Sequence, residues 1–244
     1  MISKEEIKRL RKLHSAKGRE ETGLFLAEGE KSVAELQLSG LEVKAVYFVK
    51  GYMPATMRKS LVFVEVNEAE MGRISQFSSP SPVAAVGVIP QKQPITGNRL
   101  LYLDRITDPG NAGTIVRLCH WFGVDAVLMG EGSVECWNPK MVQASMGSVF
   151  NTNVVQHITL PDLKVLAEQG YAIVGTHLKG NDIREWKPVA RTIVIMGNES
   201  QGMSAEIEQL CSSLVRIPGN GSAESINVAA ASAIVLYEWN NKNK

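Results

Sequence analysis

The sequence predicts an α/β protein whose larger, C-terminal part is a mostly parallel sheet and whose N-terminal part is a smaller α/β unit. Apolar runs alternate with helical patterns from about residue 99 onward, a pattern typical of parallel sheets. Breaker residues gather at 90–98, and shorter β-rich runs precede them. With 244 residues, 44% of them hydrophobic, the chain can build the core of one large or two modest domains.

The first expected element is an amphipathic helix at the N-terminus. Ser3 and Glu6 have capping-box spacing, and apolar residues follow at roughly helical intervals. Residues 1–20 hold seven basic and three acidic residues, an excess of four positive charges. A charge run of this kind is most often a solvated helix face, so we expect its charges to point outward.

The next elements complete a small α/β unit. A helical pattern from about Glu30 to Leu38 ends at Gly40. Short β-rich runs follow at 43–49, 61–66 and 83–89. Residues 90–98 lose periodicity, which predicts an interdomain linker. We therefore expect one domain at residues 1–92 and a second at residues 98–244.

Four short apolar runs in the second domain fit buried strands. They lie at residues 100–103, 126–129, 172–175 and 193–196, with helical candidates between them. This alternation favours a parallel sheet covered on both faces, and such sheets bind ligands at the carboxyl ends of their strands. Glycine-rich turns at strand ends are therefore the expected places for a site.

Composition narrows the class of protein. The net charge of +1 says little about partners. Cys119, Cys136 and Cys211 lie far apart without a C-x-x-C pair, so we expect neither a disulfide framework nor a metal site, and a reducing cytoplasm fits. No stretch approaches the roughly 18 apolar residues of a membrane span, so we expect no membrane association.

Common nucleotide and hydrolase motifs are missing from the sequence. There is no G-x-x-x-x-G-K-[ST] phosphate loop, and the nearest approach to G-x-G-x-x-G, at residues 130–135, lacks its last glycine. A serine-hydrolase elbow is also absent, and the four histidines have no recognisable paired nucleophile. P-loop NTPases, kinases, common NAD enzymes and serine hydrolases are therefore disfavoured.

The first segment that could carry catalytic or binding residues spans residues 103–117. It is expected to form a strand, a breaker-rich turn and a helix. Asn111 and Arg117 are six residues apart, almost two helical turns, so both can face one pocket if the helix begins near Asn111. Asn111 could instead cap the helix. Arg117 stands among apolar residues, where an arginine needs an anionic partner, either a ligand or a structural carboxylate.

The second segment, residues 193–204, is a buried strand that runs into a glycine-containing turn. Met196 and Gly197 would place bare backbone beside a ligand, because glycine permits close approach. Glu199 has the chemistry to hold a ribose hydroxyl or an amine. An ordinary strand-to-helix turn capped by Ser204 explains this segment equally well.

The third segment, residues 214–231, is a glycine-rich loop that opens an alanine-rich helix. Such a helix N-terminus can hold an anion or a nucleoside. Ser225 is explained if it caps the helix, whereas Asn227 in the first turn has no evident structural reason.

In this order, the three segments resemble the three motifs of the SpoU (TrmH-type) family of RNA ribose 2′-O-methyltransferases, within the SPOUT class. The resemblance covers about residues 100–240, and residues 25–31 look like the opening of the family's N-terminal substrate-binding domain. It implies a small ribosomal-protein-like α/β domain, then a parallel-sheet domain with a deep trefoil knot that forms a homodimer. The chain departs from the family pattern at Ser200, Gly219 and Ile226.

The resemblance also implies a division of labour among the motif residues. Those matching the polar set are Asn111 and Arg117 in the first motif, Asn198, Glu199 and Gly202 in the second, and Ser225 and Asn227 in the third. S-adenosyl-L-methionine would be held by Met196, Gly197, Asn198, Gly202, Ile217, Pro218 and Ile226. Catalysis would fall to Arg117, Asn111, Glu199, Ser225 and Asn227, without a metal.

The expected function is transfer of a methyl group to an RNA ribose, with ribosomal RNA favoured over transfer RNA because a separate N-terminal domain is present. Alternatives are a transfer RNA methyltransferase, a base-methylating SPOUT enzyme and a catalytically silent RNA-binding relative. The family's favoured base is Arg117, but a guanidinium with a pKa above roughly 12 accepts protons poorly. We therefore expect Arg117 to grip the phosphate and ribose. The basic N-terminal helix and residues 73–77 are expected to contact the RNA.

Overall fold

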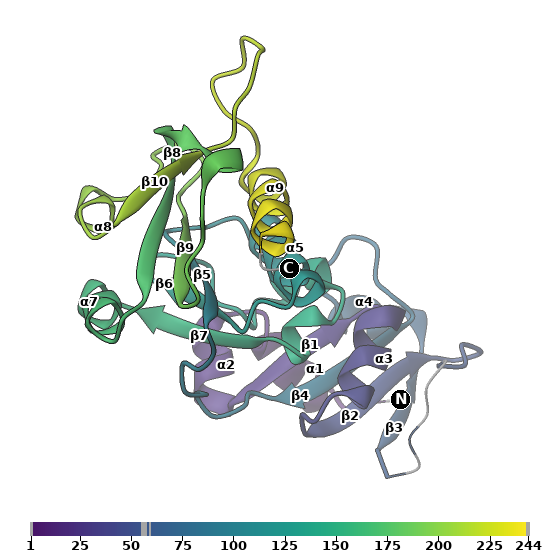
Figure 1. Cartoon of the computed structure of the whole chain (residues 1–244). Helices are drawn as coiled ribbons and strands as arrows, with labels where there is room; N and C mark the ends of the chain where they lie inside the picture. Colours follow the sequence, from purple (N-terminus) through teal and green to yellow (C-terminus); the bar gives the residue numbers. More distant parts are fainter. Residues whose placement is uncertain (1, 55–57, 59, 243–244) are drawn as a thin grey trace. The chain divides into compact units, whose positions relative to one another are not determined.

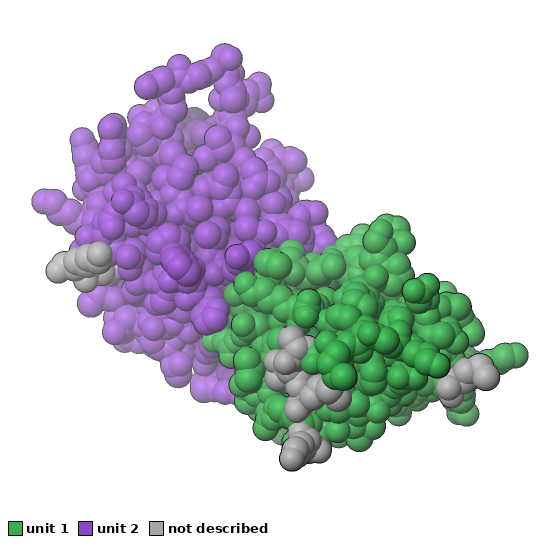
Figure 2. All heavy atoms as spheres, turned by 90° about the vertical axis from the view of Figure 1, so that its right-hand side faces the viewer, with its two compact units in different colours: residues 1–91, 135–151 green, residues 92–134, 152–244 purple. Residues whose placement is uncertain are grey.

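The chain folds into two compact units. The computed structural model describes residues 2–54, 58 and 60–242. Unit 1 comprises residues 1–91 and 135–151, and unit 2 comprises residues 92–134 and 152–244; Figure 2 shows them in green and purple. The chain therefore crosses between the units three times, after residues 91, 134 and 151.

The basic N-terminal segment forms two helices, α1 (Lys4–Lys12) and α2 (Ala16–Thr22). Ser3 caps the first, as expected, and a second N-cap at Ser15 starts the other. The expectation that every charge points outward is wrong for Arg19. Its side chain is buried and forms an ion pair with Glu135, because a buried guanidinium requires a carboxylate partner.

Unit 1 contains a four-stranded sheet in the order β1-β4-β2-β3. Its further elements are β1 (Leu24–Glu28), α3 (Glu30–Leu38), β2 (Val43–Val49), β3 (Phe63–Val66), α4 (Glu68–Ile74) and β4 (Val83–Val88). Strand β4 is antiparallel to β1 and β2, and β3 is parallel to β2. The predicted runs at 43–49, 61–66 and 83–89 thus form strands, although β3 starts at Phe63, where pairing with β2 begins.

Helices cover both faces of this sheet (Figure 1). Leu10 and Leu13 of the α1 segment and Met71 of α4 pack with Leu26 and Tyr47 in one apolar core. On the other face, α3 lies against β1 and β4.

Residues 135–151 complete unit 1, although they lie far along the chain. They contain α6 (Pro139–Ser145) and the short helix η1 (Ser148–Phe150). Trp137 and Phe150 stack on Phe25 with ring centroids 4.5 and 5.7 Å away, and Glu135 reaches Arg19. Stacked aromatic pairs contribute beyond their buried area, so this segment forms part of the core of unit 1.

Unit 2 is built on a six-stranded sheet in the order β10-β8-β9-β5-β6-β7. The strands are β5 (Arg99–Leu103), β6 (Ala126–Gly130), β7 (Asn153–Ile158), β8 (Ala172–Asp182), β9 (Thr192–Met196) and β10 (Ser213–Arg216). Every pairing in this sheet is parallel, which confirms the predicted parallel sheet. The carboxyl ends of all its strands therefore meet at one edge.

Helices cover both faces of the unit 2 sheet, also as predicted. α7 (Leu160–Glu168) and α8 (Ala205–Glu208) lie on one side, and α5 (Pro109–Phe122) and α9 (Val228–Asn241) on the other (Figure 1). Successive strand residues point to opposite faces, so Leu100 and Tyr102 enter the core on the side of α7 and α8. The short helix η2 (Ile183–Glu185) follows β8.

Strand β8 is longer than the predicted run at 172–175. It pairs with β10 at Gly175, and pairing resumes only at Asn181, so residues 176–180 bulge from the ladder near the carboxyl edge. Of the helices in the described part of the chain, none is long and apolar enough to cross a membrane.

Candidate active site at the carboxyl edge of the parallel sheet

The first motif segment joins β5 to α5. Asp108 is the N-cap of α5 and accepts a hydrogen bond from the backbone N–H of Asn111 at 2.7 Å. The alternative that Asn111 caps the helix is therefore wrong, because Asp108 already fills that position. Asn111 lies in the first turn, where its side chain is available for other partners.

A line of hydrogen bonds joins all three motif segments through Asn111. Its Nδ2 donates to Oε1 of Glu199 at 2.8 Å, and its Oδ1 accepts from Nδ2 of Asn227 at 3.0 Å. Asn111 comes from α5, Glu199 from the loop after β9, and Asn227 from the start of α9. Residues separated by up to 116 positions thus meet at one place. We call Glu199, Asn111 and Asn227 the polar relay.

Asn227, not Ser225, caps α9. Its Oδ1 accepts hydrogen bonds from the N–H groups of Ala229 and Ala230 at 2.9 and 3.2 Å. The expectation that Ser225 caps this helix is therefore wrong, because the helix begins three residues later, at Val228. Capping of α9 is therefore the structural reason for Asn227 that the sequence alone did not reveal. Asn227 also takes part in the polar relay.

Two substitutions at Asn227 separate these roles. Asn227→Asp keeps an oxygen for the cap but has no N–H to donate to Asn111, whereas Asn227→Ala removes both interactions. We expect Asn227→Ala to lower the free energy of unfolding by about 1 kcal/mol and Asn227→Asp to leave it unchanged or raised. Both variants should lose the methyl transfer that the sequence resemblance implies, measured with a labelled methyl donor. Full activity in Asn227→Asp would contradict a functional role for the relay.

The loop after β9 is a tight turn closed on itself. Asn198 and Gly202 exchange two backbone hydrogen bonds of 3.0 and 2.9 Å. Gly202 has φ 69°, which favours glycine, and a Cβ on Gly197 would lie 2.5 Å from backbone atoms of Gly202 and Met203. Both glycines are therefore needed for the turn to form.

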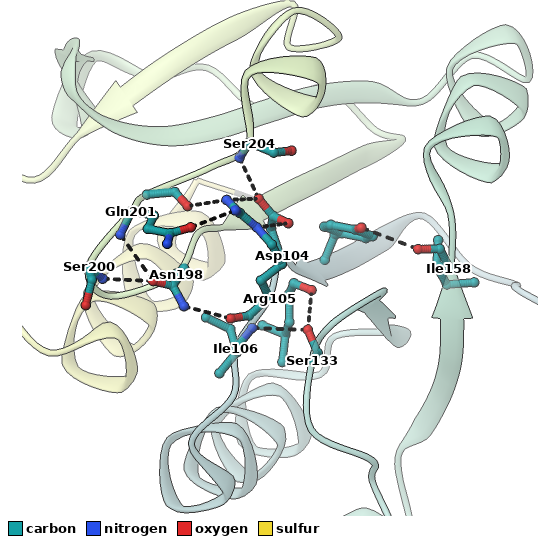
Figure 3. Close-up of polar contacts among 12 residues, drawn as sticks. Asp104, Arg105, Ile106, Ser133, Ile158, Asn198, Ser200, Gln201 and Ser204 are labelled. Carbon is teal, nitrogen blue, oxygen red and sulfur yellow. Dashed lines mark hydrogen bonds and ion pairs between the residues drawn. The ribbon is translucent and has the colours of Figure 1, made fainter.

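The side chain of Asn198 organises this loop from inside. Its Oδ1 accepts from the N–H groups of Ser200 and Gln201 at 3.0 and 3.1 Å, and its Nδ2 donates to the carbonyl of Arg105 at 2.8 Å (Figure 3). Ser200, where the sequence departs from the family pattern, contributes its backbone to this arrangement. Met196, before the loop, is buried and Gly197 is half-buried.

Asp104 and Arg105, directly after β5, also contact this loop, and sequence reasoning missed both. The carboxylate of Asp104 accepts from the N–H of Ser204 at 2.7 Å, and the guanidinium of Arg105 reaches Gln201 and Gly202 (Figure 3). A charged pair that follows a buried strand at the ligand-binding edge is the sequence signal that could have identified them.

Arg117 lies on the exposed face of α5, while its neighbours Ile115 and Val116 are buried. The expectation of an arginine enclosed by apolar residues is therefore wrong, because helical periodicity separates residues that are adjacent in sequence. Trp121, one turn further on, is 83% exposed. The guanidinium of Arg117 therefore lies on the surface of α5, beside the exposed Trp121.

The third motif loop is open to solvent. Residues 218–227 are all exposed, Ile226 by 50%, and Ile217 is half-buried. Figure 1 shows this loop projecting between β10 and α9. Ser225, Ile226 and Pro218 are thus presented on the surface, next in sequence to the relay residue Asn227.

The cysteines offer no thiolate for covalent catalysis. None of the three forms a disulfide. Burial raises the pKa of Cys211 to about 11 and also raises the pKa values of Cys119 and Cys136. Within the described residues, no group of three or more His, Cys, Asp or Glu side chains could hold a metal ion.

Two family models match the chain. The SpoU rRNA Methylase family matches residues 98–237, which include all three motif segments. The MRM3-like substrate binding domain matches residues 4–85, within unit 1.

Individual relatives agree over nearly the full length. The 23S rRNA (guanosine(2553)-2′-O)-methyltransferase RlmP of Bacillus subtilis is 30% identical, covering 96% of this chain and 95% of that protein. A TrmH-family protein from Porphyromonas gingivalis is 32% identical with a TM-score of 0.88, covering 98% of both chains. An AdoMet-bound rRNA methyltransferase from Sinorhizobium meliloti is 29% identical with a TM-score of 0.84, covering 98% of this chain and 95% of that one. The chain therefore belongs to the SpoU rRNA Methylase family.

Proposed function

We propose that this protein transfers a methyl group from S-adenosylmethionine to a ribose 2′-hydroxyl of ribosomal RNA. The polar relay carries this proposal, because it joins three separate loops at the ligand-binding edge of a parallel sheet. Relatives support it: one is named for 2′-O-methylation of 23S rRNA, and another was solved with AdoMet bound. An intact relay argues against a catalytically silent relative.

The residues present fit the cofactor. A nucleoside with an amino-acid tail needs backbone hydrogen-bonding groups at close range, and the Gly197 and Gly202 turn exposes backbone without side chains. We assign Met196, Gly197, Asn198 and Gly202 to one wall of this site, and Ile217, Pro218 and Ile226 to the other. When bound, S-adenosylmethionine supplies a methyl group on a positively charged sulfur.

Transfer requires the ribose oxygen to approach the methyl carbon in line with the carbon–sulfur bond. The cofactor would supply the methyl group and leave as the neutral thioether, and the residues around the ribose would orient its 2′-oxygen while the hydroxyl proton is lost to a nearby acceptor or to water. Positioning supplies much of the acceleration in such a reaction. We assign this positioning to Asn111, Asn227 and Ser225, with Glu199 fixing the amide of Asn111.

Arg117 is assigned to the RNA, where it grips the phosphate and ribose of the target nucleotide. A guanidinium provides a planar set of donors that matches a phosphate. It acts as a base only if the substrate phosphate perturbs it. Its exposure on α5 leaves it accessible to a large ligand.

Ribose is favoured over a pyrimidine carbon as the methyl acceptor. Methylation of a pyrimidine carbon often requires a nucleophile that attacks the ring, and thiols serve only as thiolates. Burial raises the pKa values of Cys119, Cys136 and Cys211, which disfavours that role. A hydroxyl acceptor needs no such group.

We assign residues 1–92 to binding of the RNA substrate and residues 98–244 to methyl transfer, although residues 135–151 of the second range pack with unit 1. The exposed cations of α1 are Lys4, Lys8, Arg9, Arg11 and Lys12, of which Arg9 pairs with Glu6. Of residues 73–77, Arg73 and Gln76 are exposed, so we retain only these two as RNA contacts. Ser75 is buried against Glu28 and is excluded.

The α1 contacts are expected to make RNA affinity fall with added salt. Replacing Lys8 and Lys12 by alanine should reduce the slope of log affinity against log salt by about 0.7–0.9 per lost phosphate contact. The measurement is a filter-binding titration with ribosomal RNA at several salt concentrations. Lys164→Ala on α7, exposed in unit 2, is the control. An unchanged slope in the double variant would contradict this role of α1.

We also propose that the methyltransferase domain carries the trefoil knot and forms a homodimer. Helices α5 and α9 pack together and expose Trp121 by 83%, Tyr237 by 55% and Ile234 by 39%. A second copy of this face would cover these apolar side chains. Trp121→Glu with Tyr237→Glu should therefore convert a dimer to a monomer in sedimentation; an unaltered chain that is already monomeric would contradict the dimer.

Mapping of ribose methylation tests the proposed function. RNA from cells with and without this protein should differ at a single ribose of ribosomal RNA, and the purified protein should restore that mark with S-adenosylmethionine. A mark that disappears from transfer RNA instead would reassign the substrate. Fractionation of the same cells should recover the protein in the cytoplasm, the compartment that we propose from its unpaired thiols.

A further inference from the structure

Two consecutive residues at the end of β5 hold the loop after β9. Oδ2 of Asp104 accepts from the N–H of Ser204 at 2.7 Å, where the loop ends. The carbonyl of Arg105 accepts from Nδ2 of Asn198 at 2.8 Å, where the loop begins. Figure 3 shows both contacts converging on the turn between β5 and α5.

The side chain of Arg105 holds the middle of the same loop. Its Nη1 donates to Oε1 of Gln201 at 2.9 Å, and its Nη2 donates to the carbonyl of Gly202 at 3.2 Å. Asp104 and Arg105 therefore bind the loop at its start, middle and end. We call these two residues the loop clamp.

The two members of the loop clamp also bind each other. The side chain of Asp104 is 4% exposed, and Nε of Arg105 lies 3.2 Å from its Oδ1. A buried carboxylate needs a charged or hydrogen-bonding partner to offset its lost hydration. The ion pair therefore fixes the guanidinium in the direction of Gln201 and Gly202 and limits its rotation.

The backbone of Arg105 is in a conformation that few residues with side chains adopt. Its φ is 54°, in the left-handed region, which is unfavourable for arginine. Such strain persists where surrounding contacts enforce it, and it gathers at functional sites. Here Oγ of Ser133 accepts from the N–H of Ile106 at 3.1 Å and donates to the carbonyl of Leu103 at 3.0 Å, which holds the turn from its other side.

The loop has little else to determine its shape. Glu199, Ser200, Gln201 and Gly202 are all exposed, so packing contributes little there. Polar contacts and the Asn198–Gly202 pairing must therefore fix the turn. That turn carries both the proposed cofactor backbone and Glu199, the end of the polar relay.

We propose that Asp104 and Arg105 are positioning residues that set the shape of the cofactor loop through their contacts with it, and that these contacts hold the strained backbone of Arg105 in place. The inference rests on the proposed function, because it identifies the loop as a cofactor site. Neither residue needs to touch the cofactor, since each acts through the loop.

The test compares Arg105→Gly with Arg105→Ala in the full-length protein. Glycine relieves the left-handed strain and removes the guanidinium, whereas alanine removes the guanidinium and keeps the strain. Both variants should bind S-adenosylmethionine roughly tenfold more weakly in a calorimetric titration, the loss expected for one charge-assisted hydrogen bond. Arg105→Ala should melt at a lower temperature than Arg105→Gly, because only alanine keeps the backbone strain.

Two further variants and one direct readout sharpen this test. Asp104→Asn should weaken cofactor binding as Arg105→Gly does, and Arg105→Lys should not restore it, because one ammonium cannot reach both acceptors. Backbone hydrogen exchange of residues 197–204 should become faster in all of these variants. Arg184→Ala, which breaks the exposed Asp182–Arg184 pair, is the matched control and should change neither quantity.

The outcomes separate this inference from the proposed function. Cofactor affinity within about twofold of the unaltered protein in Arg105→Gly and Asp104→Asn, or affinity that follows melting temperature instead of the guanidinium, would overturn the loop clamp alone. A protein that binds no S-adenosylmethionine before any substitution would overturn the proposed function and the inference together.

Discussion

Arg117→Ala is expected to reduce methyl transfer by at least about 100-fold while leaving the affinity for S-adenosylmethionine nearly unchanged. Displacing the acceptor hydroxyl by about 1 Å is sufficient for a loss of this size. Arg117 lies on the exposed face of α5 and belongs to none of the loops assigned to the cofactor. Single-turnover transfer to ribosomal RNA and calorimetric titration with the cofactor measure the two quantities.

The conservative variant Arg117→Lys distinguishes charge from geometry. Lysine keeps the positive charge but cannot form the two parallel hydrogen bonds of a guanidinium, so we expect it to recover only a small part of the activity. Turnover near that of the unaltered protein in Arg117→Ala would remove Arg117 from the site.

Glu135→Ala is expected to destabilise unit 1 more than any other single surface-facing substitution that we describe. The substitution leaves the guanidinium of Arg19, whose side chain is 3% exposed, without its carboxylate. Removing one partner of a buried ion pair typically costs about 3 kcal/mol or more, and Glu135 is 25% exposed, so we expect the lower end. The melting temperature should fall by roughly 6–12 °C, measured by calorimetry.

An exposed ion pair on the same helix provides the control. Lys17 and Glu21 are 3.9 Å apart with side chains 85% and 51% exposed, so Glu21→Ala should leave the melting temperature almost unchanged. The double variant Arg19→Met with Glu135→Ala should recover part of the stability, because no buried charge remains. A fall equal to that of Glu135→Ala would show that the pair itself is not the cause.

Local sequence patterns predicted the strands well where burial of apolar side chains is the dominant contribution. The apolar runs that became β5, β6, β8 and β9 are buried on both faces, and continuous hydrophobicity marks such strands. β7 and β10 were not anticipated, because these strands at the two edges of the sheet carry polar residues such as Gln156 and Ser213. Neither the length of an apolar run nor its alternation with polar residues identifies these edge strands.

The sequence identified the segments that form the candidate site, but not the contacts between them. The motif segments identified Asn111, Glu199 and Asn227, but not that these three side chains form one hydrogen-bonded line, which depends on tertiary contacts. The roles of Ser225 and Asn227 as cap were reversed, because both residue types cap helices and only the backbone decides. Asp104 and Arg105 were missed since their partners are about 100 residues away in sequence.

The return of residues 135–151 to unit 1 has a consequence for exchanging parts between family members. A chimera that joins the first 92 residues of one protein to the remainder of another would pair Phe25 and Arg19 with a foreign Trp137 and Glu135. Unit 1, to which we assign RNA binding, is therefore inherited as two pieces of chain. Grafting a new RNA specificity onto this scaffold requires both pieces to be transplanted together.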